Sequence, residues 1–253
     1  MENKQITKSN FNYSNSLNLA VETSGRIGSV AIGCREKILG QRTFSGPMTH
    51  SIELFPALNS ILENIGKKPS DIHQIYISIG PGSFTGLRIA VTIAKSMFLA
   101  NKVKIVPVNT LDIIAQNTMH FENDLKKDLS NIAVILDAKR SHFFAASYTK
   151  KGGYWERKTP DSLTTAPDFL DRFAEIKPLW LIGEGLQYHR NAFQTPNIQF
   201  VNEKYWTANA ENLYNLGWEK AKTGHFADPF TLKPNYMCRP EAEIKWKQRN
   251  NKG

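Results

Sequence analysis

The stretch "ISIGPGSFTGLR", residues 77–88, connects two apolar segments and marks a change from strand to helix. Residues 75–79 are apolar and β-branched, which predicts a buried strand. Residues 84–100 contain no helix breaker after Gly86 and are long enough to form a helix. The quoted stretch is therefore predicted to be a strand-to-helix turn.

The glycines of this turn leave two interpretations open. Gly80, Gly82 and Gly86 allow backbone angles that other residues avoid, and N–H groups at a helix N-terminus attract anions, so the turn could hold a phosphate. Alternatively, Ser83 or Thr85 caps the helix and the glycines only make the turn tight. The missing Lys-Ser/Thr ending of a P-loop favours the structural interpretation.

The segments on both sides of the turn continue an alternation of strands and helices. Strand signals at 17–22 and 28–33 predict a hairpin, and the apolar spacing of residues 49–66 predicts a helix. After the helix at 84–100, "VKIVPVNT" predicts a buried strand and "LDIIAQNTM" another helix. This order indicates the α/β class.

The same plan returns in the second part of the chain. "LAVE" at 19–22 aligns with "VILD" at 134–137, and "YISIGPG" at 76–82 aligns with "LWLIGEG" at 179–185. The repetition predicts a duplicated α/β protein. The expected parts are a mobile tail at 1–16, halves at 17–119 and 132–253, a linker at 120–131, and a polar surface loop at 149–167.

Apolar runs, cysteines and net charge indicate the environment and the partners of the protein. None of the apolar runs in the 253 residues approaches the roughly 20 that a membrane span needs, and the start has no secretion signal, so we expect a soluble protein. Cys34 and Cys238 are far apart and form no metal or redox spacing, which fits a reducing cytoplasm. The net charge of +9 favours polyanionic partners such as RNA.

Several motifs resemble the bacterial TsaB (YeaZ) family, in the same order. They are "LAVETS", "THSIELFPALNSIL", "GPGSFTGLRI", "PVNTLDIIA", "ILDAKRSHFFAASY", "LIGEG" and "LKPNYMCRPEAEIKWK". The resemblance covers about residues 17–248 and implies a duplicated actin-like (ASKHA, ribonuclease-H-like) fold, with two mixed-sheet halves facing a cleft. It also implies a role in making threonylcarbamoyladenosine in tRNA, next to the anticodon.

The resemblance further implies partners and a division of labour. Family members are non-catalytic partners of a TsaD-like subunit, and a TsaE-like ATPase completes the assembly. The metal site of TsaD uses histidines on a helix, but here no two histidines are three or four residues apart, so we predict no metal site. The resemblance to a non-catalytic family implies that the chain has no catalytic residue. The histidines are His50, His73, His120, His142, His189 and His225.

A nucleotide-binding role is an alternative for this chain. In the actin-like fold an acid of the first hairpin holds Mg²⁺ beside the phosphates, and here that position is Glu22, where TsaB relatives more often have Asp. Glu22 could equally bond the turn, and Asp137 could simply pair with Arg140. The candidates are Glu22, Thr23, Gly82, Ser83 and Asp137. We assign no cofactor to the chain; ATP and Mg²⁺ are implied for the partner complex.

Two helices carry the predicted partner interface. Gly86, Ala90 and Ala94 recur every four residues and would let another helix approach closely. These residues could form the core, but the resemblance favours docking on a TsaD-like subunit or, without it, on a second copy. The full predicted interface is Phe55, Leu58, Leu62, Ile65, Gly86, Leu87, Ala90, Val91, Ala94 and Phe98.

The C-terminal segment offers a predicted contact with tRNA. Its basic residues exceed its acidic ones, and aromatic residues lie between them, so phosphate contacts and base stacking are both available; a solvated tail is the alternative. The candidates are Lys233, Arg239, Lys245, Trp246, Lys247 and Arg249.

These observations favour a cytoplasmic scaffold subunit that activates a TsaD-like enzyme and reaches tRNA through the complex. The rival hypothesis is an independent ATP-dependent kinase or carbamoyltransferase of the same fold.

Overall fold

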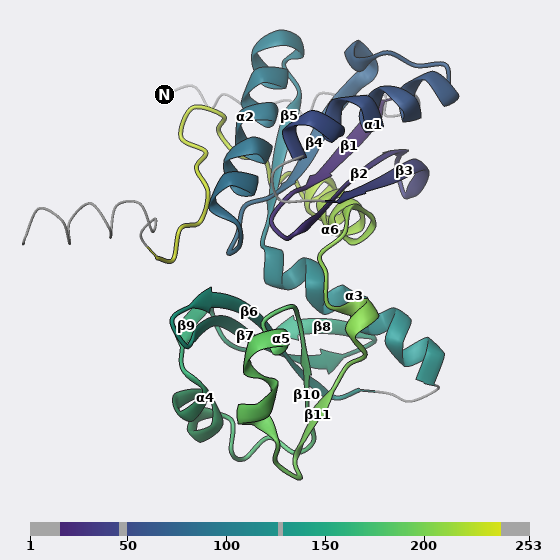
Figure 1. The fold of residues 1–253 in the computed structure, drawn as a ribbon. Helices are drawn as coiled ribbons and strands as arrows, with labels where there is room; N and C mark the ends of the chain where they lie inside the picture. Colours follow the sequence, from purple (N-terminus) through teal and green to yellow (C-terminus); the bar gives the residue numbers. More distant parts are fainter. Residues whose placement is uncertain (1–15, 46–49, 126–128, 239–253) are drawn as a thin grey trace, which may run out of the picture.

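The computed structural model describes residues 16–45, 50–125 and 129–238. The described residues form two sheets, one above the other in Figure 1, with helices around and between them. None of the described helices is long and apolar enough to cross a membrane. Most of the predicted tail, residues 1–15, lies outside the described residues.

The first sheet has the strand order β3-β2-β1-β4-β5. β1 pairs antiparallel with β2, which pairs antiparallel with β3, while β1, β4 and β5 are parallel neighbours. The predicted hairpin is therefore part of a three-stranded meander. Its edge strand, β3, was not predicted because it carries many polar residues. The strands are β1 Leu17–Glu22, β2 Ile27–Cys34, β3 Lys37–Ser45, β4 Ile72–Ser78 and β5 Lys104–Val108.

The second sheet repeats this plan in the order β11-β10-β6-β7-β8, with β9 also paired to β7. β6, β7 and β8 form the antiparallel meander, and β10 and β11 add parallel strands beside β6. The predicted duplication and fold class are confirmed. The strands are β6 Asn131–Lys139, β7 His142–Lys151, β8 Tyr154–Arg157, β9 Ser162–Thr164, β10 Leu179–Ile182 and β11 Ile198–Phe200.

One sequence prediction is wrong at this level, and a second overlaps a helix. Residues 149–167 are not all surface loop, because they contain the end of β7 and the short strands β8 and β9, whose Gly and Pro neighbours obscured them. The predicted linker at 120–131 is helical as far as Leu125.

Each half of the chain contributes one helix that packs on the sheet of the other half. α1 and α2 pack on the first sheet, and α6, from the second half of the sequence, contacts β1, β2, β4 and β5. α3, from the first half, packs on β6 and β7, and Figure 1 shows it between the sheets. The helices are α1 His50–Asn64, α2 Phe84–Asn101, α3 Thr110–Leu125, α4 Ala166–Arg172, α5 Leu186–His189 and α6 Ala210–Lys222.

The two cores follow from this exchange of helices. One core, with Leu19 and Leu54 among its fully buried residues, lies between the first sheet and α1 and α2. The other runs from Tyr76 on the opposite face of the first sheet, through Leu111 of α3, to Ile135 of the second sheet. This core contains residues from both predicted halves, so the two halves share one hydrophobic core.

Candidate functional site

The GPGSFTG turn is bonded to the turn between β1 and β2. Ser83 N–H donates to Ser24 O at 2.7 Å, and Ser83 Oγ accepts from Gly86 N–H at 3.3 Å, which caps α2. Thr23 Oγ1 donates to Gly86 O at 2.7 Å. Ser83 therefore has the geometry of a helix cap, as the structural interpretation of this loop predicts.

The glycines allow the two turns to approach closely. A Cβ atom on Gly86 would lie 1.7 Å from Thr23 O, and one on Gly82 would lie 2.6 Å from Ser24 O. Such distances are sterically forbidden, so the carbonyl groups of the β1–β2 turn fill the space that side chains would need. Gly82 and Gly86 are thus explained by packing, without a phosphate.

Glu22 ends β1 inside this packed region. Its side chain has no exposed surface, and Oε1 accepts from Ser24 N–H at 2.6 Å and from the Ser24 hydroxyl. Oε2 has no hydrogen-bond partner among the described atoms. Burial raises the pKa of Glu22, hydrogen bonds from Ser24 oppose that effect, and the charge of Glu184 adds to it.

These surroundings do not fit a magnesium ligand. Mg²⁺ needs octahedral oxygen ligands and usually keeps several waters, whereas Glu22 is closed off from solvent and one of its oxygens bonds the turn. The described residues also contain no group of three or more His, Cys, Asp and Glu side chains placed to hold a metal.

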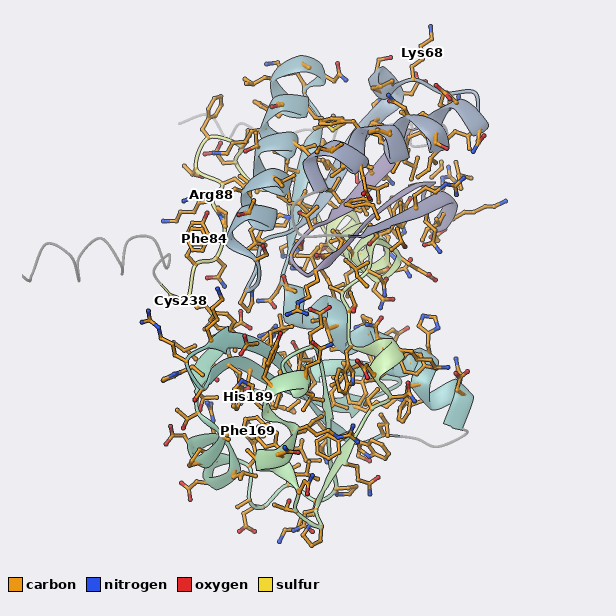
Figure 2. All side chains as sticks on the ribbon, viewed as in Figure 1. Lys68, Phe84, Arg88, Phe169, His189 and Cys238 are labelled. Carbon is orange, nitrogen blue, oxygen red and sulfur yellow. The ribbon has the colours of Figure 1, made fainter. Side chains whose placement is uncertain are left out.

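The corresponding acid of the second half has different surroundings. Asp137 Oδ1 lies 3.2 Å from His189 Nε2, and the two side chains are 28% and 11% exposed. The predicted local pair with Arg140 is therefore corrected: Arg140 sits in the β6–β7 turn with φ of 53°, and α5 supplies the histidine instead. His189, labelled in Figure 2, lies in the lower half beside the ring of Phe143.

The turns of the two halves meet at the strand ends. A Cβ atom on Gly25 would lie 3.7 Å from Glu184 Oε1, and Arg26 hydrogen bonds to the Tyr188 hydroxyl. Glu184 Oε1 also accepts from Thr207 Oγ1 at 2.9 Å. Sequence reasoning aligned Glu22 with Asp137 but missed Glu184, although the "LIGEG" repeat that contains it was recognised.

The comparisons with known proteins agree with this architecture. TsaB of Bacillus subtilis, named a tRNA threonylcarbamoyladenosine biosynthesis protein, is 29% identical over 90% of this chain and 96% of its own length. TsaB of Escherichia coli is 25% identical over 67% of this chain and 71% of its own. A family model described as TsaD, tRNA N6-adenosine threonylcarbamoyltransferase, matches residues 47–246. The chain belongs to this family, on its TsaB/YeaZ branch.

Solved structures of YeaZ proteins share the fold. An uncharacterized Pseudomonas aeruginosa protein, described as similar to peptidase YEAZ, has a TM-score of 0.73 and 22% identity, covering 88% of this chain and 100% of that one. A second structure, YeaZ from Pseudomonas aeruginosa, gives a TM-score of 0.72 at 21% identity over the same shares of the two chains.

The interface expected from the TsaB/YeaZ resemblance is mostly buried. The small-residue stripe of α2 faces inward: Gly86 contacts Thr23, and Ala90 and Ala94 pack in the core, so that part of the prediction is corrected. Phe55 is 52% exposed, while Ile65 and Phe98 are partly buried. The predicted residues that are buried are Leu58, Leu62, Gly86, Leu87, Ala90, Val91 and Ala94.

Other apolar residues of the same helices are exposed and were missed. Ile52 on α1 is 70% exposed and Leu99 on α2 is 64% exposed. Helical periodicity alone could not separate the two faces, because both faces of each helix carry apolar side chains.

The C-terminal segment covers part of α2. Tyr236 stacks on Phe84 with ring centroids 3.9 Å apart, and Arg88 Nε donates to the Tyr236 hydroxyl at 3.1 Å. Figure 2 shows Phe84 and Arg88 together where this segment passes α2. Of the predicted tRNA contacts, Lys233 is exposed. Outside the described residues lie Arg239, Lys245, Trp246, Lys247 and Arg249.

Proposed function

We propose that this chain is a non-catalytic, activating subunit in the formation of threonylcarbamoyladenosine in tRNA. The observation that carries the proposal is the bonding of the GPGSFTG turn to the β1–β2 turn. Backbone carbonyl groups of that second turn occupy the space beside Gly82 and Gly86, where a phosphate would otherwise bind. The names of the TsaB relatives supply the pathway. The role places the chain in the cytoplasm with tRNA.

The proposed partner is a TsaD-like catalytic subunit, completed by a TsaE-like ATPase that uses ATP and Mg²⁺. The outer faces of α1 and α2 supply the docking surface, since Ile52, Phe55 and Leu99 expose apolar area that a partner would bury. Without that subunit, the same surface would pair two copies of this chain.

The experiment mixes the purified chain with a TsaD-like subunit, a TsaE-like ATPase and tRNA, and measures complex formation and tRNA modification. Phe55→Arg and Ile52→Arg should each weaken the complex by about tenfold or more and lower modification in parallel. Tyr154→Arg is the matched control, because Tyr154 is 81% exposed but lies on β8 of the other half. Ala94→Arg is unsuitable, since Ala94 is fully buried and the variant would misfold.

Equal complex formation by the folded α1 variants and the control would place docking elsewhere. Unchanged modification without any complex would reject the scaffold role itself.

The rival function, an independent ATP-dependent kinase or carbamoyltransferase, is favoured by one observation. Glu184 and the Asp137–His189 pair lie at the strand ends where the halves meet. Calorimetry with ATP and a turnover assay on the isolated chain separate the two functions. Micromolar binding with product formation that Asp137→Asn abolishes would establish the rival.

The basic C-terminal segment supplies the proposed contact with tRNA. Lys233 is exposed and the segment carries further basic residues. Truncation after Pro234 should weaken tRNA binding by the complex and reduce its dependence on salt. Unchanged binding at all salt concentrations would remove this contact.

A further inference from the structure

A cavity of about 310 Å³ lies at the far end of the first sheet from the Glu22 region. It is lined by Arg35, Gln74, Trp218, Ala221 and Lys222. Gln74 lies early in β4 and pairs with Asn18 near the beginning of β1, whereas Glu22 ends β1. The cavity therefore has no part in the strand-end turns or the outer faces of α1 and α2.

Two cations from different elements border this cavity. Arg35 follows β2, and Lys222 is the last residue of α6. Lys222 Nζ lies 2.7 Å from Glu219 Oε1, and the two side chains are 43% and 62% exposed, so this ion pair contributes little to stability. The five lining residues include no acid, and the cavity therefore favours an anionic group.

The remaining wall is suited to an apolar, planar molecule. Trp218 is only 9% exposed, and Ala221 beside it leaves room against the indole. The packing of Gly217 against Tyr76 holds this part of α6 close to the sheet, because a Cβ atom there would lie 2.4 Å from the tyrosine ring. The volume falls within the range of small-molecule pockets, about 300–1,000 Å³.

Polar atoms without partners occur in the same region. Trp218 Nε1 and Asn18 Oδ1 are buried and have no hydrogen-bond partner among the described atoms. Asn18 lies on the α6 side of the sheet, since its Nδ2 donates to Tyr214 of α6 at 3.3 Å. Both atoms are closed off from solvent and Asn18 does not line the cavity, so the case for a bound molecule rests on the lining residues.

We propose that this cavity binds a small, planar apolar molecule that carries one carboxylate or phosphate. Arg35 and Lys222 hold the anionic group, and the ring system lies against Trp218 and Ala221. The proposal is independent of docking and of tRNA modification.

The test is calorimetric titration of the full chain with 2-naphthoate and with its neutral counterpart, 2-naphthylmethanol. Naphthoate should bind at one site at least tenfold more tightly than the alcohol, and Arg35→Gln should remove most of that difference. A parallel titration with 2-naphthyl phosphate shows which anion is preferred. Lys67→Gln is the control, because it removes an exposed charge beyond the end of α1 without touching the cavity.

Two further variants keep the result clear if Arg35→Gln is unstable. Arg35→Lys should retain much of the binding because it keeps the charge, and Ala221→Leu should block both probes by filling the cavity. Circular dichroism verifies that each variant is folded. Failure of both anions to bind at millimolar concentration, equal binding of anion and alcohol, or full binding to folded Ala221→Leu would each overturn the proposal.

Discussion

The two strand-end acids, Glu22 and Asp137, occupy corresponding places in a repeated plan but have opposite surroundings. Glu22 has no exposed surface and accepts hydrogen bonds from Ser24 of its own turn, while Asp137 is 28% exposed and lies beside His189. Backbone packs closely on glycines in both halves, since a Cβ atom on Gly183 would lie 2.3 Å from Ile135 O, but the second half also keeps a polar pair near solvent. Duplication therefore preserved the strand order without preserving the chemistry of the strand ends.

The largest expected effect tests how tightly the first strand end is closed. Gly86→Ala should destabilise the protein by about 3 kcal/mol or more, because its Cβ atom would overlap Thr23 O. Thermal and urea denaturation measure the loss. Gly66→Ala is the control, since Gly66 also lies in a turn but has open space around it; its positive φ predicts a loss of about 1 kcal/mol.

The next effect concerns the equivalent closure in the second half. Gly185→Ala would place a Cβ atom 2.8 Å from Ile135 Cγ2 and 2.9 Å from Ile135 O, which is tight but less severe. We expect a loss of about 1–2 kcal/mol by urea denaturation. A loss as large as that of Gly86→Ala would show that both strand ends are equally closed and would remove the contrast.

The next prediction is a smaller gain of stability, which depends on pH and comes from replacing Glu22. Because burial raises the pKa of Glu22, the folded state holds its proton to higher pH than the unfolded state, whose carboxyl titrates near 4.5. Wild-type stability should therefore fall as pH rises above about 4.5, and Glu22→Gln should remove this fall. Urea denaturation from pH 4 to 8 should show the variant gaining on the wild type. The reverse trend would mean that Glu22 is ionised and paired in the folded protein.

The smallest expected effect is on Asp137. Asp137→Asn should change the free energy of unfolding by less than about 1 kcal/mol at neutral pH, because a partly exposed pair contributes little. Denaturation midpoints of the variant and wild type provide the measurement. A loss above 2 kcal/mol would show that this pair is as integral to the fold as the buried turn of the first half.

The sequence was sufficient to predict the duplicated strand order, because β1, β4, β6 and β10 are mostly apolar segments whose repetition is visible. It was insufficient for β3, β8 and β9, which lie at or near sheet edges and carry polar residues. Edge strands bury little apolar surface, so their periodicity is weak.

The site was predictable in part for similar reasons. Glu22 and the capping role of Ser83 follow from local patterns. The approach of Glu184 to Gly25 and the burial of Ala90 and Ala94 depend on contacts between distant segments. A residue spacing that fits helix docking fits core packing equally well, and only the tertiary structure distinguishes them.

The exchange of α3 and α6 between the halves has a consequence for synthesis on the ribosome. The first sheet is complete at Val108, but the helix that covers its second face ends at Lys222. More than a hundred further residues must be translated before α6 can bury Tyr76 and its neighbours. A nascent chain stopped before Ala210 would present that bare face to chaperones and to other unfinished chains.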